Sequence, residues 1–192
     1  KTAGGGDFAV PILAGPNGFG GVSNSVPYGK LFLELTCDRS SFNFKRAPGD
    51  NPLPFTGPIN NFGVPGVKVG DVLNPNVGVP GAPGYNVFYG RIAKNPGVST
   101  IISDAKSVNP PFFTMWLGNN DILGWAASGG TSGSLTDPAT FSTQLNAALD
   151  SMLAVSPNIK GAVANLPDVT AIPYFQAVTA GLISAKAIPI TL

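Results

Sequence analysis

The sequence predicts an α/β protein in which helices cover both faces of a parallel β-sheet, a three-layer α/β/α arrangement. Three features of the second half of the chain support this prediction. An apolar run at Phe112–Leu117 ends abruptly in Gly-Asn-Asn-Asp, an amphipathic helix follows from Asp137, and a second apolar run occupies residues 159–166. Strand, helix and strand in this order, with short connections, imply a right-handed parallel crossover.

The first apolar run, Phe112–Leu117, predicts a buried parallel strand. Asn109-Pro110-Pro111 stops any helix before it, and Gly118-Asn119-Asn120-Asp121 follows it directly. Such a strand delivers polar groups to the carboxyl edge of the sheet, where open α/β folds bind their ligands. Trp116 lies inside the run, and we expect it to pack in the core.

Two helices flank this strand in the sequence. Residues 98–108 fit a helix with Ile101, Ile102, Ala105 and Val108 on one face. Asp137 and Pro138 are typical of a helix cap and first turn, and Pro157-Asn158 would end that helix. Its apolar residues recur at a spacing of three and four, which predicts one face packed on the sheet: Phe141, Leu145, Ala148, Leu149 and Met152. Residues 159–166 then form a second core strand.

The first half of the chain is rich in loops, because most of the 25 glycines and 19 prolines fall there. Lys30–Thr36 predicts a strand, and Val67–Leu73 begins a helix that Pro75 would end. We expect one incomplete domain over residues 1–192. It has a loop-rich region at 1–59 and the α/β core at 60–192.

Composition excludes several functions. Charged residues make up 11% of the chain and the net charge is +1, so no basic face for nucleic acid and no polybasic membrane patch is expected. No window holds about 18 consecutive apolar residues, so no membrane-spanning segment is predicted. The single cysteine, Cys37, is expected to be a small buried side chain. With no histidine, the chain predicts no zinc site and no complete Ser-His or Cys-His mechanism.

Two turns bear glycine and asparagine after candidate strands. They are Asn61–Gly66 and Gly118–Asp121. Glycine lets a backbone N–H face a ligand, and an asparagine carboxamide adds a neutral donor. One donor of each kind, converging from neighbouring strand ends, makes an oxyanion hole for ester cleavage. Each turn taken alone is also explained as a plain turn.

At these residues the chain resembles the SGNH, or GDSL, hydrolases. Asn61-x-Gly63-x-x-Gly66 matches the second sequence block of that family, and Gly118-x-Asn120-Asp121 matches its third block, G-x-N-D. The surrounding sequence, including NNFGVPG, FFTMWLGNND and VANLPDVTAIPYF, is similar to exported members of this family from Bacteroidetes, which are often lipid-anchored at the cell surface. The resemblance is specific from Asn60 to Phe175 and loose over residues 1–59.

The resemblance implies a flavodoxin-like parallel sheet and serine ester hydrolysis without metal or cofactor. Gly63 would donate its backbone N–H to the oxyanion and Asn120 its side-chain N–H. Asp121, Asn61 and Gly118 would support this turn geometry. The substrate would be an ester of a carbohydrate or of a lipid, and the protein would be exported to the cell surface or periplasm, in some cases within an outer-membrane complex.

Two blocks of the family have no counterpart in these residues. They are the block with the nucleophilic serine and the D-x-x-H block with the histidine. We therefore expect the chain to be the middle of a longer protein, with other segments or another chain completing its sheet. We expect these residues alone to hydrolyse no ester. The rival hypothesis is a non-catalytic surface scaffold or glycan-binding subunit that keeps the fold.

Two side chains and one loop each allow two interpretations. Trp125 either contacts substrate or packs in the protein. Asp168 either lines the cleft or caps a turn after Pro167. The Ser128–Gly133 run is either a lid or an ordinary flexible loop.

Overall fold

A computed structural model describes residues 7–12, 15, 18–19, 28–47, 54–131, 133, 135–173 and 175–176. These residues form a mixed α/β structure with small two-stranded sheets, one of them parallel. The chain divides into two compact units. The first unit comprises Lys1–Pro65 and Pro75–Val108, and the second comprises Gly66–Asn74 and Asn109–Leu192.

Antiparallel strands begin the first unit. β1 (Gly18–Phe19) pairs with β2 (Tyr28–Gly29), and β3 (Leu31–Leu35) pairs with β4 (Phe42–Arg46). β3 confirms the strand predicted at 30–36, whereas its partner β4 was not predicted. All residues of β3 and β4 are exposed.

Cys37 is exposed, so the prediction of a buried thiol is wrong. The residue lies in the turn that joins β3 to β4. A turn at the end of a two-stranded hairpin has no layer packed on it, and the small apolar character of cysteine does not place it in a core.

Short helices form the core of the first unit. They are η2 (Pro75–Gly78), α1 (Val87–Gly90) and α2 (Ile101–Lys106). α2 confirms the predicted helix but is shorter, because Thr100 caps it in a reciprocal capping box with Ser103. The apolar residues buried here are Val64, Val77, Tyr89, Ile92, Ile101 and Ile102.

A buried carboxylate ties this core together. Asp104 is 2% exposed, and its Oδ2 accepts hydrogen bonds from the Tyr89 hydroxyl at 2.9 Å, the Ser99 hydroxyl at 3.2 Å and the Lys94 backbone N–H at 3.0 Å. Burial, and then the neighbouring carboxylate, raises the pKa of Tyr89. Tyr89 therefore stays a neutral donor, and the network fixes α2 against the loop before it.

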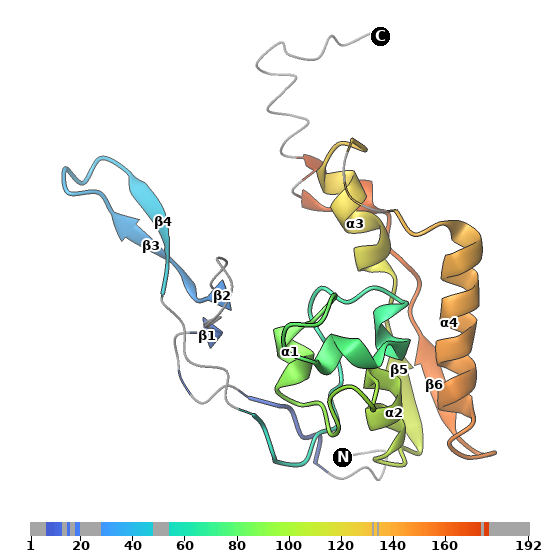
Figure 1. The fold of residues 1–192 in the computed structure, drawn as a ribbon. Coiled ribbons are helices and arrows are strands. Elements are labelled where there is room, and N and C mark those ends of the chain that lie inside the picture. The colour runs from blue at the N-terminus through green and yellow to red at the C-terminus, as the bar shows by residue number, and fades with distance from the viewer. Residues whose placement is uncertain are drawn as a thin grey trace, which may run out of the picture. The chain divides into compact units, whose positions relative to one another are not determined.

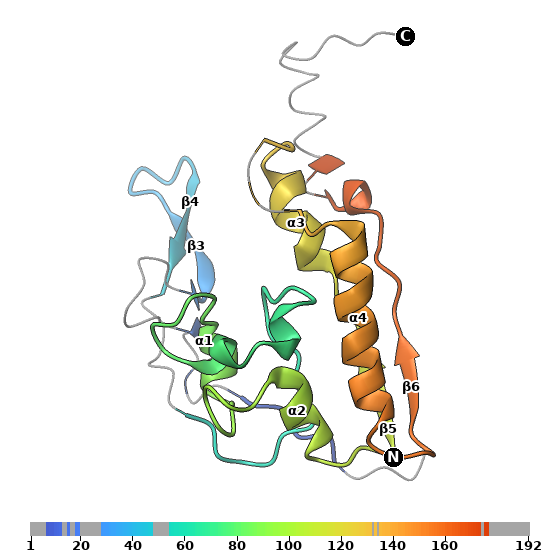
Figure 2. The same ribbon diagram turned by 45° about the vertical axis from the view of Figure 1, so that its right-hand side comes forward.

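The second unit contains the parallel pair. β5 (Phe112–Met115) pairs in parallel with β6 (Lys160–Val163), and α4 (Pro138–Leu153) lies between them in the sequence. α4 runs alongside these strands in both views (Figures 1 and 2). This confirms the predicted order of strand, helix and strand with parallel pairing. The other elements are η1 (Asp71–Leu73), α3 (Asn119–Ala127) and η3 (Val169–Ala171).

α4 begins as predicted. Asp137 Oδ1 accepts hydrogen bonds from the backbone N–H groups of Ala139 and Thr140, and Pro138 occupies the first turn. Ala148 and Met152 are its buried residues, both on the predicted apolar face. The helix predicted from Val67 is reduced to the single 3₁₀ turn η1.

Burial in the parallel pair differs from the prediction. Phe113 and Met115 are buried, but Phe112 and Thr114 on the alternate face are exposed, and so is every residue of β6. Trp116 continues the exposed alternation and is 62% exposed, so its predicted core position is wrong. Successive strand residues point to opposite faces, and in a sheet of two strands only one face of β5 is covered.

Candidate functional site

The glycine of the G-x-N-D motif occupies a position that no other residue fits. Gly118 follows β5, is the N-cap of α3, and has φ of 111°. A Cβ built there would lie 2.8 Å from the Phe141 ring and 2.9 Å from Leu166 Cδ2. Both backbone conformation and space therefore demand glycine at the point where β5 turns into α3.

The next residues of the motif hold a distant segment of the same unit. Asn120 Nδ2 donates to the carbonyl oxygen of Val67 at 2.8 Å. The Val69 backbone N–H donates to Asp121 Oδ2 at 2.9 Å. The first turn of α3 thereby anchors the stretch that immediately follows Gly66, the last glycine of N-x-G-x-x-G.

Asp121 is a buried brace in this structure. It is 1% exposed, and the Thr136 hydroxyl donates to its Oδ1 at 2.7 Å. Each carboxylate oxygen thus accepts one short hydrogen bond, which compensates the burial of the charge. Asp121 joins three separate stretches of chain.

Asn120 retains donor capacity. A carboxamide nitrogen carries two hydrogens, and the bond to Val67 uses one of them. That bond also fixes the orientation of the amide. The second N–H of an oriented, half-buried asparagine is the kind of neutral donor that stabilises an oxyanion.

Gly63 and Asn61 form a local turn in the first unit. The Gly63 backbone N–H donates to Asn61 Oδ1 at 2.9 Å, and Gly63 is exposed. This is an Asx-type turn, in which a side chain two residues earlier replaces a backbone acceptor. Gly63 lies in the first unit and Asn120 in the second, so a shared oxyanion hole stays a prediction.

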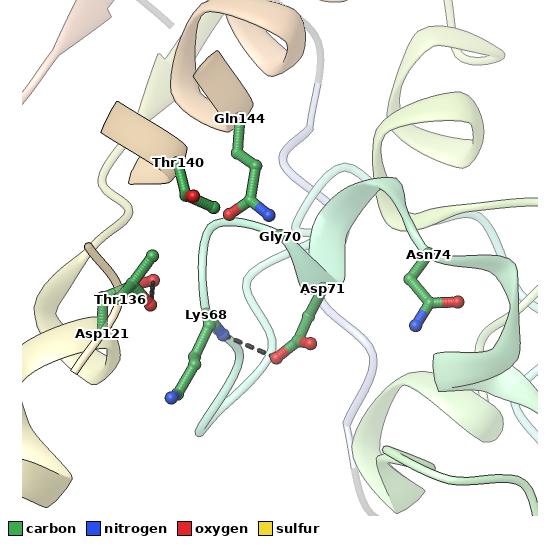
Figure 3. A pocket seen from close by; sticks show the side chains of 8 residues that line it. All are labelled: Lys68, Gly70, Asp71, Asn74, Asp121, Thr136, Thr140 and Gln144. Carbon is green, nitrogen blue, oxygen red and sulfur yellow. Dashed lines mark hydrogen bonds between the residues drawn. The ribbon is translucent and has the colours of Figure 1, made fainter. Parts of the chain in front are cut away.

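A polar hollow of about 360 Å³ lies in the second unit (Figure 3). Its walls come from the η1 region, the first turn of α3, the loop before α4 and the first half of α4. Asp71 Oδ2 accepts a hydrogen bond from the Lys68 backbone N–H at 2.8 Å, which closes the turn into η1. The lining residues are Lys68, Gly70, Asp71, Asn74, Asp121, Thr136, Thr140 and Gln144.

Only Asp121 of these eight was singled out in the sequence. Val67–Leu73 is predicted as the start of a helix, and Thr140 and Gln144 lie outside the predicted apolar face of the helix that begins at Asp137. No local pattern shows that these two stretches share a hollow.

Trp125 and Asp168 do not line the hollow. Trp125 is on α3 and is 40% exposed, and a Cβ built on Gly130 would lie 3.1 Å from its ring. Asp168 is exposed and directly precedes η3, and its carbonyl oxygen accepts a hydrogen bond from the N–H of Ala171, the last residue of η3. Substrate contact by either residue stays a prediction.

The described part of the chain contains no group of three or more Cys, Asp or Glu side chains arranged to hold a metal ion. Within the same residues, no helix combines the length and apolar character needed to cross a membrane. Comparisons of the chain with protein-family models, with curated proteins and with solved structures found no match.

Proposed function

We propose that this chain is part of an ester hydrolase of the SGNH type, with a three-layer, flavodoxin-like sheet of which β5 and β6 are two strands. One observation carries the proposal. The 2.8 Å hydrogen bond from Asn120 to Val67 joins the G-x-N-D turn to the residue directly after N-x-G-x-x-G, across 53 positions of sequence. Two motifs that would share one site are thus linked through adjacent backbone.

The proposed chemistry assigns Asn120 a neutral role. Its second N–H stabilises the negative oxygen that forms when a nucleophile attacks the ester carbonyl, and the Gly63 N–H is the second donor. Gly63 would exchange its bond to Asn61 for one to the oxyanion. Asp121 positions Asn120 by holding the first turn of α3 against Val69.

We assign neither the nucleophile nor its general base to these residues. The 192 residues include no histidine, and an unactivated serine is a weak nucleophile. The proposal therefore requires an activated serine from another segment or chain. It requires no metal or cofactor. We propose that the protein is exported and located at the cell surface or in the periplasm.

The rival proposal is a non-catalytic surface protein that binds glycans. The polar hollow favours binding of hydroxylated ligands, and it does not depend on a nucleophile. Turnover separates the two proposals, because only the hydrolase forms an acyl-enzyme.

The test uses the full-length gene product. Fluorophosphonate should label one serine outside the 192 residues printed here, and p-nitrophenyl acetate should be hydrolysed. Asn120→Ala should lower kcat by about 100-fold or more, as loss of one oxyanion donor does. Asn119→Ala, the adjacent residue on the same turn, is the matched control and should change kcat by less than about threefold. Absence of both labelling and turnover would refute the hydrolase and favour the glycan-binding protein.

A further inference from the structure

We propose that the polar hollow of the second unit binds the hydroxyl groups of a neutral carbohydrate. This makes the substrate a sugar ester rather than a lipid ester, and for the ester it rests on the proposed function. Asp71 and Gln144 are two of the side chains that present hydrogen-bonding groups to the hollow (Figure 3).

Gln144 presents its amide from α4. The amide lies directly on Gly70, because a Cβ there would be 2.8 Å from Gln144 Nε2 and 2.9 Å from Oε1. The glycine therefore makes room for this side chain. Within the described residues, the Gln144 amide has no hydrogen-bond partner, so its donors and its acceptor remain for a ligand.

Asp71 presents a carboxylate from η1. Its Oδ2 accepts the Lys68 backbone N–H at 2.8 Å, which fixes the side chain and leaves Oδ1 as an acceptor. Thr140 adds a hydroxyl, which can both donate and accept a hydrogen bond. The hollow thus offers both donors and acceptors.

The charge and polarity of the lining exclude other ligand classes. Two carboxylates, Asp71 and Asp121, face one ammonium, Lys68, so an anionic ligand meets a net negative wall. Both Asp121 oxygens already accept hydrogen bonds, which disfavours a divalent cation that needs several free carboxylate oxygens. Among the described residues that line the hollow, none has a large apolar side chain, so an acyl chain finds no partner there.

Neutral sugars match the hydrogen-bond donors and acceptors that the hollow offers. Each sugar hydroxyl both donates and accepts, so neighbouring hydroxyls pair with a carboxylate and a carboxamide at once. The volume of about 360 Å³ suits a ligand of one or two rings, since small-molecule sites begin at about 300 Å³. Asp121, which lines the hollow, directly follows the proposed oxyanion donor Asn120 in the first turn of α3.

The test measures binding of unesterified sugars to the full-length protein. Saturation-transfer NMR with cellobiose, xylobiose, lactose and chitobiose should show transfer to at least one disaccharide, and titration should give its Kd. Gln144→Ala and Asp71→Asn should each weaken binding by about tenfold, the loss of one good hydrogen bond. Asn146→Ala, an exposed polar residue on α4 outside the hollow, is the matched control and should leave Kd unchanged.

Thermal unfolding of each variant checks that it folds. Gly70→Ala is a second probe, since its Cβ would displace the Gln144 amide and weaken the same sugar. No transfer to any of the four disaccharides, or a Kd in the Gln144 and Asp71 variants that is unchanged from the parent protein, overturns the inference. Sugar binding without hydrolysis would support the carbohydrate site and refute the proposed hydrolase. Hydrolysis of p-nitrophenyl acetate without sugar binding would support the hydrolase and refute the carbohydrate site.

Discussion

Phe113 lies over Gly161, its register partner on the neighbouring parallel strand. A Cβ on Gly161 would come within 2.4 Å of the Phe113 ring. The ring therefore fills the space above the Gly161 backbone that a side chain at this position would need. A glycine that weakens a strand by itself is here required by the aromatic side chain across from it.

Gly161→Ala should lower the free energy of unfolding by about 1–3 kcal/mol, because the added methyl group forces the Phe113 ring to move in a packed region. Urea unfolding of the full-length protein measures the change. Gly124→Ala on α3 is the control, since a Cβ there meets nothing within 4 Å. It should be neutral or stabilising by up to about 1 kcal/mol. Equal losses for both variants would contradict the close packing.

Gly118→Ala should be more damaging than Gly66→Ala. Both residues have positive φ, 111° and 80°, but only Gly118 also has side chains within 3 Å of an added Cβ. Gly66→Ala should cost about 1–2 kcal/mol from backbone strain alone, and Gly118→Ala that cost plus overpacking of about 1–3 kcal/mol. The comparison uses chemical denaturation of both variants. A larger loss for Gly66→Ala would show that the crowding at Gly118 is relieved at little cost.

Asp121→Ala should destabilise the protein by about 3 kcal/mol, because it leaves the Val69 N–H and the Thr136 hydroxyl without their buried acceptor. Hydrogen exchange of the Val69 amide should accelerate in the same variant. Asp150→Ala, an exposed residue of α4, is the control and should stay within about 0.5 kcal/mol of the parent. An unchanged exchange rate at Val69 would remove Asp121 from its bracing role.

Asp137 should make the stability of α4 depend on pH. Hydrogen bonds from the Thr140 side chain and then from its backbone hold the pKa of Asp137 below its ordinary value. A carboxyl with a depressed folded pKa stabilises the fold above its unfolded pKa, and this contribution is lost as pH falls through the folded pKa. NMR titration of Asp137 should therefore give a pKa below the ordinary value of an aspartate side chain.

Asp137→Asn tests the same assignment. Asparagine caps helices as well as aspartate does but does not titrate. The variant should retain α4 near pH 7 and lose the acid-dependent part of the change in helix signal below about pH 4. An identical acid profile in parent and variant would mean that other carboxyls govern it.

Local chemistry explains the predictions that the structure confirms. The α4 start is encoded by Asp137 and Pro138, whose capping and φ preference act on the next few backbone groups. Its buried face follows from a spacing of three and four residues. The parallel pairing of β5 and β6 follows from the order of strand, helix and strand with short connections.

The predictions that failed concern which surfaces are covered. Trp116 and Cys37 are apolar residues that the sequence favours for a core, yet both are exposed. Apolar character is a local property, whereas burial depends on a second layer from elsewhere in the chain. Neither the hairpin turn at Cys37 nor the outer face of β5 at Trp116 has such a layer in the described structure.

By itself, the sequence determined the start of α4 and the glycine that ends β5, because each depends on groups a few residues apart. It also determined the parallel pair, because a strand, a helix and a strand with short connections favour that pairing. Only the tertiary structure decided that Asn120 bonds to Val67, that Asp121 bonds to Val69, and that Gln144 rests on Gly70. These contacts join residues more than 50 positions apart. Their geometry depends on how η1, α3 and α4 pack, which no short sequence pattern encodes.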